Sequence, residues 1–228
     1  MSFAKFVAYI VSMKIDIDFS QTLAKEWLEE SAEPWLVLPK LSDIIRQIQS
    51  ALGPDYTQVA PEVFVHKSAK IAPTACVLGP CIVGPKTEIR HCAFVRGSAI
   101  FGEGCVVGNS TEVKNSIFSN GAKAPHFNYV GDSILGKNAH LGAGAITSNV
   151  KGNGTRVSVF VGTKKYDTGL KKFGAIVGDN AEVGCNAVLC PGTIVGSGVQ
   201  VYPLVLVRGV VPKNTIVKSS TNIAKKEF

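Results

Sequence analysis

Bulky apolar residues recur every six positions along most of this chain, and glycine, proline, asparagine or lysine often follows them. The longest unbroken run is Val65, Ile71, Val77, Val83, Ile89, Val95, Phe101, Val107 and Val113. With two five-residue steps, the register continues through Phe118, Ala124, Val130, Leu135, Leu141 and Thr147. After an interruption it resumes at Val177, Val183, Leu189, Val195, Val201 and Val207.

A six-residue period is typical of a hexapeptide β-helix, in which three short strands form each triangular coil. It fits neither the 3.6-residue period of an α-helix nor a series of hairpins with ordinary turns. The 21 repeats predict a mainly β protein of about seven coils. We expect the β-helix to span residues 61–212, with a loop inserted at 150–174 and a basic tail at 213–228.

The first sixty residues lack this period and predict a helical N-terminal extension, residues 1–60. Ser20 is expected to cap one helix, which Glu33-Pro34 would end. Ser42 is expected to cap a second helix, which Gly53-Pro54 would end. Neither segment contains a glycine-rich phosphate loop, so the simplest predicted role of these helices is to pack against the repeats.

Composition narrows the class of protein. Only 8% of residues are aromatic and 18% are charged, while glycine contributes 23 residues, which suits short strands joined by tight turns. No stretch approaches ~18 uninterrupted apolar residues, so we expect no membrane span. The apolar segment Phe6–Met13 lacks a clear cleavage site, which disfavours a signal peptide, and Met13 is an alternative start of the natural chain.

Charge and cysteine content point to partners and compartment. The net charge of +7 arises from local lysine clusters, which favour anionic ligands, although a solvated face is the commoner explanation. These clusters lack the series of stacking aromatic residues typical of nucleic-acid binding, so we expect the chain to bind no nucleic acid.

The six cysteines form no CxxC pair, and we expect them to be small buried side chains of a protein in a reducing, cytoplasmic compartment. Neither zinc-finger spacing nor an HxxxxH pair occurs, so we expect no metal.

Residues at the same place of the repeat, one coil apart, are expected to stack. Arg96 follows Val95 and Lys114 follows Val113, three repeats later, so the two cations should lie ~5 Å apart on one edge. Such closely placed cations favour an anion between them, and a phosphate fits well. The alternative is that both side chains extend separately into water.

Three more polar residues fall in the same neighbourhood. Glu112 and Tyr129 end equivalent repeats on consecutive coils, so Tyr129 should stack on Glu112. His126 is the third residue of its repeat and should stack against Ala143. A histidine on a β-helix is more often structural than catalytic, but a nearby carboxylate could orient it and fix its tautomer. Together with the two cations, these groups are sufficient for phosphate binding and general-base chemistry.

Three motifs make a family resemblance specific: GNSTEVK at 108–114, GAKAPHFNYVGD at 121–132 and LGAGA at 141–145. They resemble the acetyltransferase domain of bifunctional UDP-N-acetylglucosamine pyrophosphorylase/glucosamine-1-phosphate acetyltransferases, and the similarity covers most of residues 60–212. The resemblance implies a left-handed parallel β-helix, a homotrimer with donor clefts between neighbours, and acetyl-CoA as cosubstrate. Too few residues precede the repeats for a pyrophosphorylase domain, so a stand-alone acetyltransferase is expected.

The resemblance also implies roles by position. His126 would be the general base that removes a proton from the sugar amine, and Glu112 would orient His126 or contact the sugar. The backbone N–H of Ala143 would stabilise the tetrahedral oxyanion and contact the donor. The residues implied to bind the sugar phosphate, or to contact acceptor or donor near a subunit boundary, are Arg96, Lys114, Tyr129 and Asn149.

Several positions depart from the family pattern. His140 replaces an asparagine, Cys185 replaces a CoA-contacting serine, and Val150 replaces a tyrosine. The loop 150–174 is longer than in the bacterial domain, and Lys164 in it is predicted to contact CoA phosphates. The acceptor-binding lysine of the family has three candidates here: Lys151, Arg156 and Lys164.

The leading hypothesis is therefore an acetyl-CoA-dependent N-acetyltransferase that acts on an amino sugar phosphate resembling glucosamine 1-phosphate. One alternative keeps the acyltransferase chemistry but changes the acceptor to another sugar or a nucleotide sugar. The other alternative is a non-catalytic β-helix scaffold that binds a sugar phosphate or a partner protein.

Overall fold

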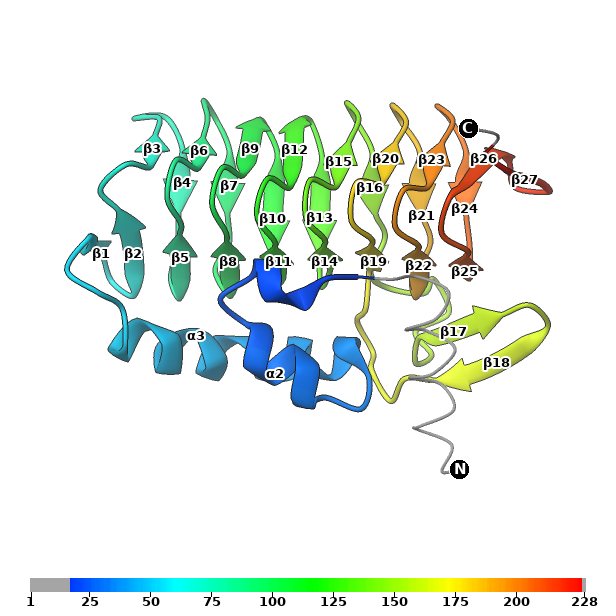
Figure 1. Ribbon diagram of the computed structural model, residues 1–228, viewed down its shortest axis with the longest axis horizontal. Coiled ribbons are helices and arrows are strands. Elements are labelled where there is room, and N and C mark those ends of the chain that lie inside the picture. The colour runs from blue at the N-terminus through cyan, green and yellow to red at the C-terminus, as the bar shows by residue number, and fades with distance from the viewer. Residues whose placement is uncertain (1–16, 227–228) are drawn as a thin grey trace.

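The computed structural model describes residues 17–226, which form a three-sided parallel β-solenoid with helices along one side (Figure 1). This architecture confirms the mainly β, hexapeptide-repeat fold predicted from the six-residue period. The segment Phe6–Met13, with the alternative start at Met13, lies outside the described residues. No helix within residues 17–226 combines the length and the apolar character needed to cross a membrane.

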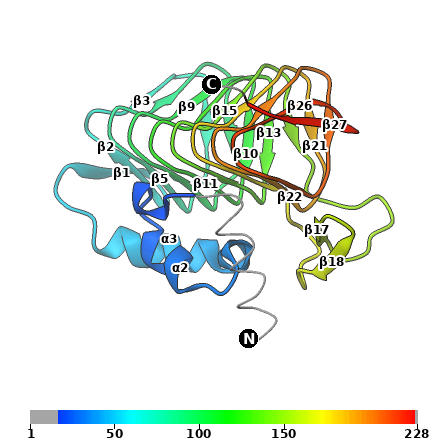
Figure 2. The same ribbon diagram turned by 45° about the vertical axis from the view of Figure 1, so that its right-hand side comes forward.

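Successive strands of the solenoid pass to three sheets in turn, which we call the first, second and third faces (Figure 2). The first face contains β1 (Tyr56–Ala60), β2 (Val63–His66), β5 (Cys81–Val83), β8 (Ala99–Phe101), β11 (Ser116–Phe118), β14 (Ile134–Leu135), β19 (Ala175–Val177), β22 (Thr193–Val195) and β25 (Val210–Val211). The second face contains β3 (Lys70–Ile71), β6 (Glu88–Ile89), β9 (Val106–Asn109), β12 (Lys123–His126), β15 (His140–Leu141), β20 (Glu182–Val183), β23 (Gln200–Val201), β26 (Thr215–Ser219) and β27 (Asn222–Lys225). The third face contains β4 (Cys76–Val77), β7 (Phe94–Val95), β10 (Glu112–Lys114), β13 (Tyr129–Gly131), β16 (Ile146–Thr147), β21 (Val188–Leu189) and β24 (Leu206–Val207). Strands β1 and β27 pair antiparallel with their neighbours at the two ends.

The apolar residues of the six-residue pattern line the interior, as predicted. Every position of that pattern from Val83 to Val207 is buried, and the first three positions are partly buried against the same core. Phe101 and Phe118 stack on consecutive coils with ring centroids 5.0 Å apart. Elsewhere this core consists mainly of valine, isoleucine, leucine and alanine, which suit a narrow interior.

The solenoid continues beyond the last predicted repeat. Val211 on β25 and Val217 on β26 extend the buried interior. The segment after residue 212, expected to be a basic tail, contains β26, which pairs parallel with β23, and then β27. The step from Val207 to Val211 is only four residues, with Gly209 at a φ of +79° in the turn, so the six-residue period does not reveal these strands.

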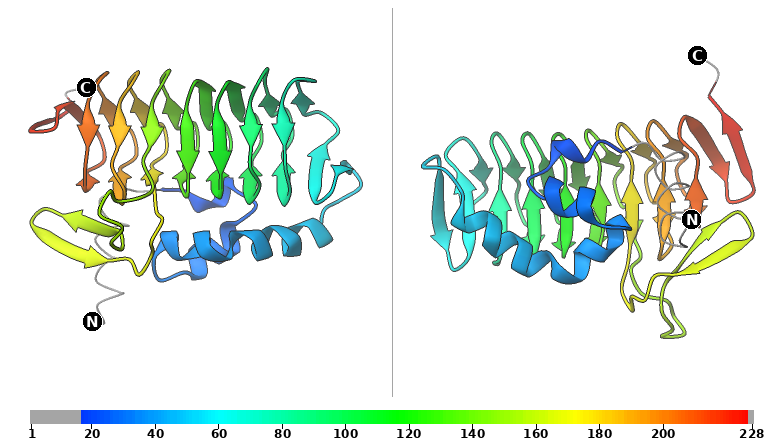
Figure 3. Two further views of the ribbon diagram at one scale, coloured as in Figure 1. Left: turned by 180° about the vertical axis from the view of Figure 1, so that it is seen from behind. Right: turned by 60° about the horizontal axis from the view of Figure 1, so that its bottom comes forward.

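Four short helices pack along the outside of the first face (Figure 3). They are η1 (Phe19–Gln21), α2 (Lys25–Glu30), η2 (Pro34–Lys40) and α3 (Leu41–Ser50). Beneath them, six successive strands of the first face each present one buried isoleucine outward: Ile82, Ile100, Ile117, Ile134, Ile176 and Ile194. The helices cover these side chains, which the solenoid alone would expose. Full burial of each isoleucine contributes ~1.5–3 kcal/mol to the stability of the fold.

The predicted helix caps are wrong, and α2 already ends at Glu30, before Glu33-Pro34, where Pro34 begins η2. The side chain of Asp18 caps η1 by accepting a hydrogen bond from the Ser20 N–H, and α2 begins later without a side-chain cap. Ser42 lies inside α3, with its Oγ 2.6 Å from Ser98 Oγ. The reason is that η2 runs directly into α3, so no free helix end exists for Ser42 to cap.

The insertion at 150–174 forms a hairpin, β17 (Ser158–Val161) and β18 (Lys164–Asp167), beside the later coils (Figure 1). Val157, Val159 and Phe173 are fully buried in the same cluster as the outward isoleucines of the first face. The Phe173 ring lies 5.6 Å from that of Trp35 in η2. The insertion is therefore held against the solenoid and the helices by apolar contacts.

The cysteine prediction is half wrong. All six side chains are free thiols; Cys81, Cys105 and Cys190 are buried, whereas Cys76, Cys92 and Cys185 are exposed. Burial raises the pKa of the Cys105 thiol to about 12, which keeps it protonated. Cys76 occupies an outward-facing strand position, and Cys92 and Cys185 lie in turns between strands. The six-residue pattern of buried residues does not include these positions.

Candidate functional site

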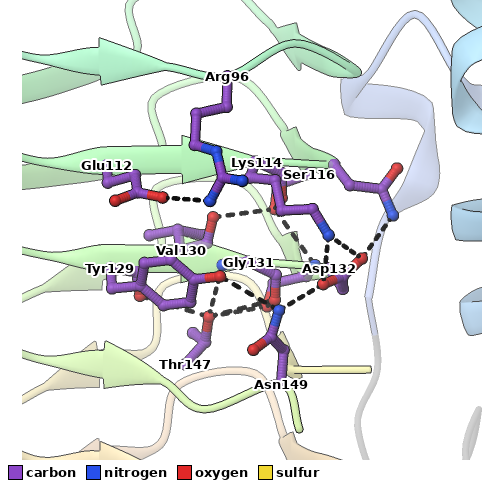
Figure 4. Close-up of polar contacts among 12 residues, drawn as sticks. Arg96, Glu112, Lys114, Ser116, Tyr129, Val130, Gly131, Asp132, Thr147 and Asn149 are labelled. Atoms are coloured by element: carbon purple, nitrogen blue, oxygen red, sulfur yellow. Dashed lines mark hydrogen bonds and ion pairs between the residues drawn. The ribbon is translucent and has the colours of Figure 1, made fainter. Parts of the chain in front are cut away.

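The predicted stacking of polar residues on the third face is confirmed by strand register. Glu112 on β10 pairs with Tyr129 on β13, and Val113 pairs with Val95 on β7. Lys114 therefore lies one coil from Arg96 at the equivalent position, as expected from the repeat spacing. Figure 4 shows the side chains of Arg96, Glu112, Lys114 and Tyr129 on adjoining coils of this face.

Each of the two cations is paired with a carboxylate of the chain itself. Arg96 Nη1 lies 2.7 Å from Glu112 Oε1, and the hydrogen bond and negative charge of Glu112 raise the pKa of the guanidinium. Lys114 Nζ lies 3.0 Å from both carboxylate oxygens of Asp132. The expectation that the two cations share one bound anion therefore changes: their charges are already balanced, by Glu112 and Asp132.

Asp132 is the centre of this network, and the sequence reasoning missed it. Its side chain is only 4% exposed and also accepts hydrogen bonds from Asn115 Nδ2, at 2.8 Å, and from Asn149 Nδ2. A buried carboxylate needs such partners to remain charged. The sequence signal that could have indicated Asp132 is the Gly-Asp pair that ends the 121–132 motif, because such a pair is typical of a tight turn. Asp132 does occupy a turn, with a φ of +49°, a conformation that aspartate tolerates well.

Tyr129 is held as a neutral hydrogen-bond donor. Asn149 Nδ2 donates to Tyr129 Oη at 3.2 Å, and the ring lies over Gly131, where an added Cβ would meet Oη at 2.6 Å. Burial raises the pKa of the Tyr129 hydroxyl and outweighs the opposing effect of the Asn149 hydrogen bond. Since its oxygen already accepts from Asn149, the hydroxyl proton is available to a ligand.

His126 lies at the end of β12, at the corner between the second and third faces, and its side chain is exposed. Within residues 17–226 its ring makes no hydrogen bond, and Glu112, expected to orient it, is bonded to Arg96 instead. Its backbone is fixed: the His126 N–H donates to Asn128 Oδ1 at 3.1 Å, and its carbonyl accepts from Gly144. The register thus brings His126 beside Ala143 on the next coil, as the spacing predicted.

The Asn128 side chain joins the corner that carries His126 to the corner that carries Ala143. It is buried and donates through Nδ2 to the carbonyls of Gly142, at 2.7 Å, and Ala145, at 3.1 Å. The N–H of Ala143 donates to no acceptor within the described part of the chain. One backbone donor is therefore left free at a rigid corner next to His126.

A pocket of about 480 Å³ opens on the second face below this corner. It is bordered by Gly142 and Cys185, and by the pair His140 and Glu182, in which Nδ1 lies 2.7 Å from Oε2. The two partners are directly opposite in the register of β15 and β20. The sequence reasoning noted His140 only as a departure from the family and missed Glu182, although the repeat spacing places it on the neighbouring strand.

Two of the three candidate cations of the inserted loop, Lys151 and Arg156, are neighbours, and Lys164 lies apart from them on the hairpin. Lys151 borders a second pocket, between the hairpin and the third face, and its Nζ donates to the Arg156 carbonyl at 3.1 Å. Arg208 borders the same pocket and was missed, although it follows Val207 as Arg96 follows Val95. Lys164 begins β18 and does not border this pocket. Among residues 17–226 no three metal-ligating side chains cluster at a metal site.

Comparisons with known proteins confirm the resemblance read from the motifs. The chain is 30% identical over 197 residues to the bifunctional protein GlmU of Methanococcus aeolicus, covering 85% of this chain and 48% of that protein. It is 26% identical over 262 residues to GlmU of an Exiguobacterium species, covering 100% and 54%. The chain thus spans about half the length of these curated relatives. No family model matches it.

The solved structures that resemble this chain include two acyltransferases. The UDP-N-acetylglucosamine O-acyltransferase LpxA of Moraxella catarrhalis aligns over 69% of each chain with a TM-score of 0.47 and 15% identity. The acetyltransferase domain of PglB from Neisseria gonorrhoeae, in complex with acetyl coenzyme A, aligns over 81% of this chain with a TM-score of 0.33 and 18% identity.

Proposed function

We propose that the chain is an acetyl-CoA-dependent N-acetyltransferase whose acceptor is an amino sugar phosphate resembling glucosamine 1-phosphate. The observation that carries this proposal is the corner where His126 adjoins Ala143, whose N–H has no acceptor in residues 17–226. A free backbone donor beside an exposed imidazole is the arrangement that acyl transfer needs. The similarity to GlmU proteins, one relative being called a sugar-1-phosphate nucleotidylyltransferase/acetyltransferase, supports the same chemistry.

In this proposal His126 acts as the general base. It takes a proton from the acceptor amine as the nitrogen attacks the thioester carbonyl of acetyl-CoA, and a neutral imidazole is suited to this near pH 7. The Ala143 N–H donates to the oxyanion of the tetrahedral intermediate. When the carbon–sulfur bond breaks, CoA leaves as the thiolate, and the new amide remains on the sugar.

The network on the third face would bind the acceptor. The Arg96 side chain is 46% exposed and donates to Glu112 through Nη1, so its other N–H groups can reach a phosphate. Tyr129 can donate its hydroxyl proton to a sugar or phosphate oxygen. Lys114 and Asn149 position this surface through Asp132 and complete its polar lining.

We also propose that the chain acts as a homotrimer with acetyl-CoA bound between neighbours. The third face exposes apolar side chains beside the polar network, among them Phe94, Ile146 and Leu206, which are 37–49% exposed. A neighbouring copy on this face would bury them. The pocket beside Cys185 would then accept part of the donor.

The proposal is tested by incubating the protein with acetyl-CoA and a panel of amino sugars and amino sugar phosphates, while the released CoA thiol is followed. We expect release with an amino sugar phosphate, and a kcat about 10²- to 10⁴-fold lower for His126→Ala. His91→Ala is the matched control, because it removes another exposed histidine that borders neither of the two pockets. No release with any acceptor would support the scaffold alternative. Full activity of His126→Ala would leave acetyl transfer standing but remove His126 as the base.

A further inference from the structure

A second pocket, of about 420 Å³, lies where the inserted hairpin meets the third face. It is lined by two cations, Lys151 and Arg208, by the apolar residues Phe160 and Pro191, and by polar residues that include Ser148 and Asn153. The volume falls within the ~300–1,000 Å³ typical of small-molecule sites. None of the roles implied by the family resemblance or proposed for acetyl transfer uses this pocket as a whole.

The charge of this pocket is unbalanced, unlike that of the network around Asp132. No carboxylate borders it. Within residues 17–226 Arg208 makes no ion pair and hydrogen-bonds only Cys190 Sγ, at 3.9 Å, while Lys151 Nζ hydrogen-bonds only a backbone carbonyl. Two cations beside one cavity, with no carboxylate between them, create a site for an anion.

The apolar side of the pocket is fixed to the solenoid. Val157 and Val159, on either side of Ser158, are fully buried. Gly192 and Gly209 allow the hairpin backbone to approach closely, since an added Cβ would meet Ser158 O at 2.6 Å or Phe160 O at 2.8 Å. These contacts hold the backbone of Phe160 against the solenoid, and Phe160 lines the same pocket as the two cations.

We infer that this pocket binds a nucleoside diphosphate moiety, with its phosphates at Lys151 and Arg208 and its base against Phe160. A phosphate alone would pair with the cations but would not contact the apolar residues Phe160 and Pro191. An aromatic base can stack on such residues. The pocket adjoins the acceptor network, because Ser148 and Val150, which border it, flank Asn149. The moiety has two possible sources: the 3′-phosphorylated ADP of CoA, or the nucleotide of a nucleotide sugar.

Equilibrium binding to the full chain, by calorimetry at low and at high salt, tests this inference without turnover, so its failure is distinct from failure of acetyl transfer. The probes are adenosine 3′,5′-bisphosphate and UDP, with adenosine and uridine as controls that lack phosphate. We expect saturable binding of at least one phosphorylated probe, weakened by salt, and at least ~10-fold weaker binding of its nucleoside. Preference for the adenosine probe assigns the pocket to CoA, and preference for UDP assigns it to a nucleotide sugar.

Arg208→Gln and Lys151→Gln should each weaken the bound probe by about ten- to a hundredfold, and Phe160→Leu by less. Arg90→Gln is the matched control, since it removes one exposed positive charge on the second face. Thermal unfolding checks that each variant is folded. Binding of neither probe below ~5 mM, or equal binding by folded Arg208→Gln and by the unchanged chain, would overturn the inference.

Discussion

The first and third faces of the solenoid have the same interior and opposite exteriors. On the first face the outward position is isoleucine on six successive strands, and helices and hairpin cover all six. On the third face the equivalent position changes from coil to coil, and includes Phe94, Glu112, Tyr129 and Ile146. The inward-facing residues determine the shape of each coil. The outward-facing residues are therefore free to form either a surface that other elements cover or a binding site.

A large loss of stability should follow from a change at the centre of the polar network. Asp132→Asn leaves the Lys114 ammonium, whose side chain is 23% exposed, without its carboxylate, which should lower the free energy of unfolding by ~3 kcal/mol. Chemical denaturation measures this loss. Glu112→Gln, at the more exposed Arg96 pair, should have a much smaller effect. Equal losses would show that the two pairs do not differ as burial indicates.

A comparable loss should follow from opening a cavity on the covered face. Ile117→Ala, beneath the helices, should lower the free energy of unfolding by ~2–5 kcal/mol because the site is fully buried. Ile146→Ala, at the same place of the repeat on the third face but 38% exposed, should cost less than ~1 kcal/mol. The contrast between faces fails if the two variants unfold at the same denaturant concentration.

The packing of Tyr129 over Gly131 gives a test of the site without a change of charge. Gly131→Ala places a Cβ 2.6 Å from Tyr129 Oη and must displace the ring, which should lower kcat/KM about tenfold. Gly53→Ala is the control, because its added Cβ meets nothing within 4 Å. Unchanged kinetics in folded Gly131→Ala would show that the ring position does not matter for the reaction.

Arg96→Gln should act on one class of acceptor only. Loss of the exposed guanidinium should raise the KM for phosphorylated acceptors about tenfold and leave the KM for unphosphorylated amino sugars unchanged. Arg90→Gln controls for the loss of one positive charge. A KM that rises equally for both acceptors would assign Arg96 to the framework of the site rather than to the phosphate.

The smallest effect on folding is expected from the apolar part of the third face. Ile146→Ser should change the free energy of unfolding by no more than ~0.5 kcal/mol, but should favour dissociation of the proposed trimer. Sedimentation velocity at several protein concentrations measures this. An unchanged sedimentation profile would place the subunit contact on another face.

The sequence predicted the interior well because its signal is periodic: a six-residue register determines which residues point inward and which stack. The same register placed Tyr129 on Glu112 and Lys114 beside Arg96. It could not assign the ion pairs, because a long side chain can reach carboxylates on more than one coil. Lys114 bonds Asp132, a turn residue on the following coil, which no stacking rule selects.

The errors at the ends of the fold have local causes. The four-residue step before Val211 interrupts the period, so the last strands were not expected. Ser20 does not cap a helix because Asp18 caps the first turn instead. Ser42 does not cap α3 because the 3₁₀ helix η2 continues directly into α3. Arg208 could have been found by extending the column of cations from Arg96 and Lys114.

The helical segment on the first face also alters how the molecule should unfold. A solenoid whose coils touch only their neighbours can open progressively from either end. Here Gln49 in α3 donates to the carbonyls of Glu62 and Cys81 in the early coils, while the Asp18 N–H donates to Asp179, 161 residues away. The segment thus joins the coils from Glu62 to Asp179, so these coils cannot open one after another without breaking its contacts. Unfolding should therefore be a single cooperative transition.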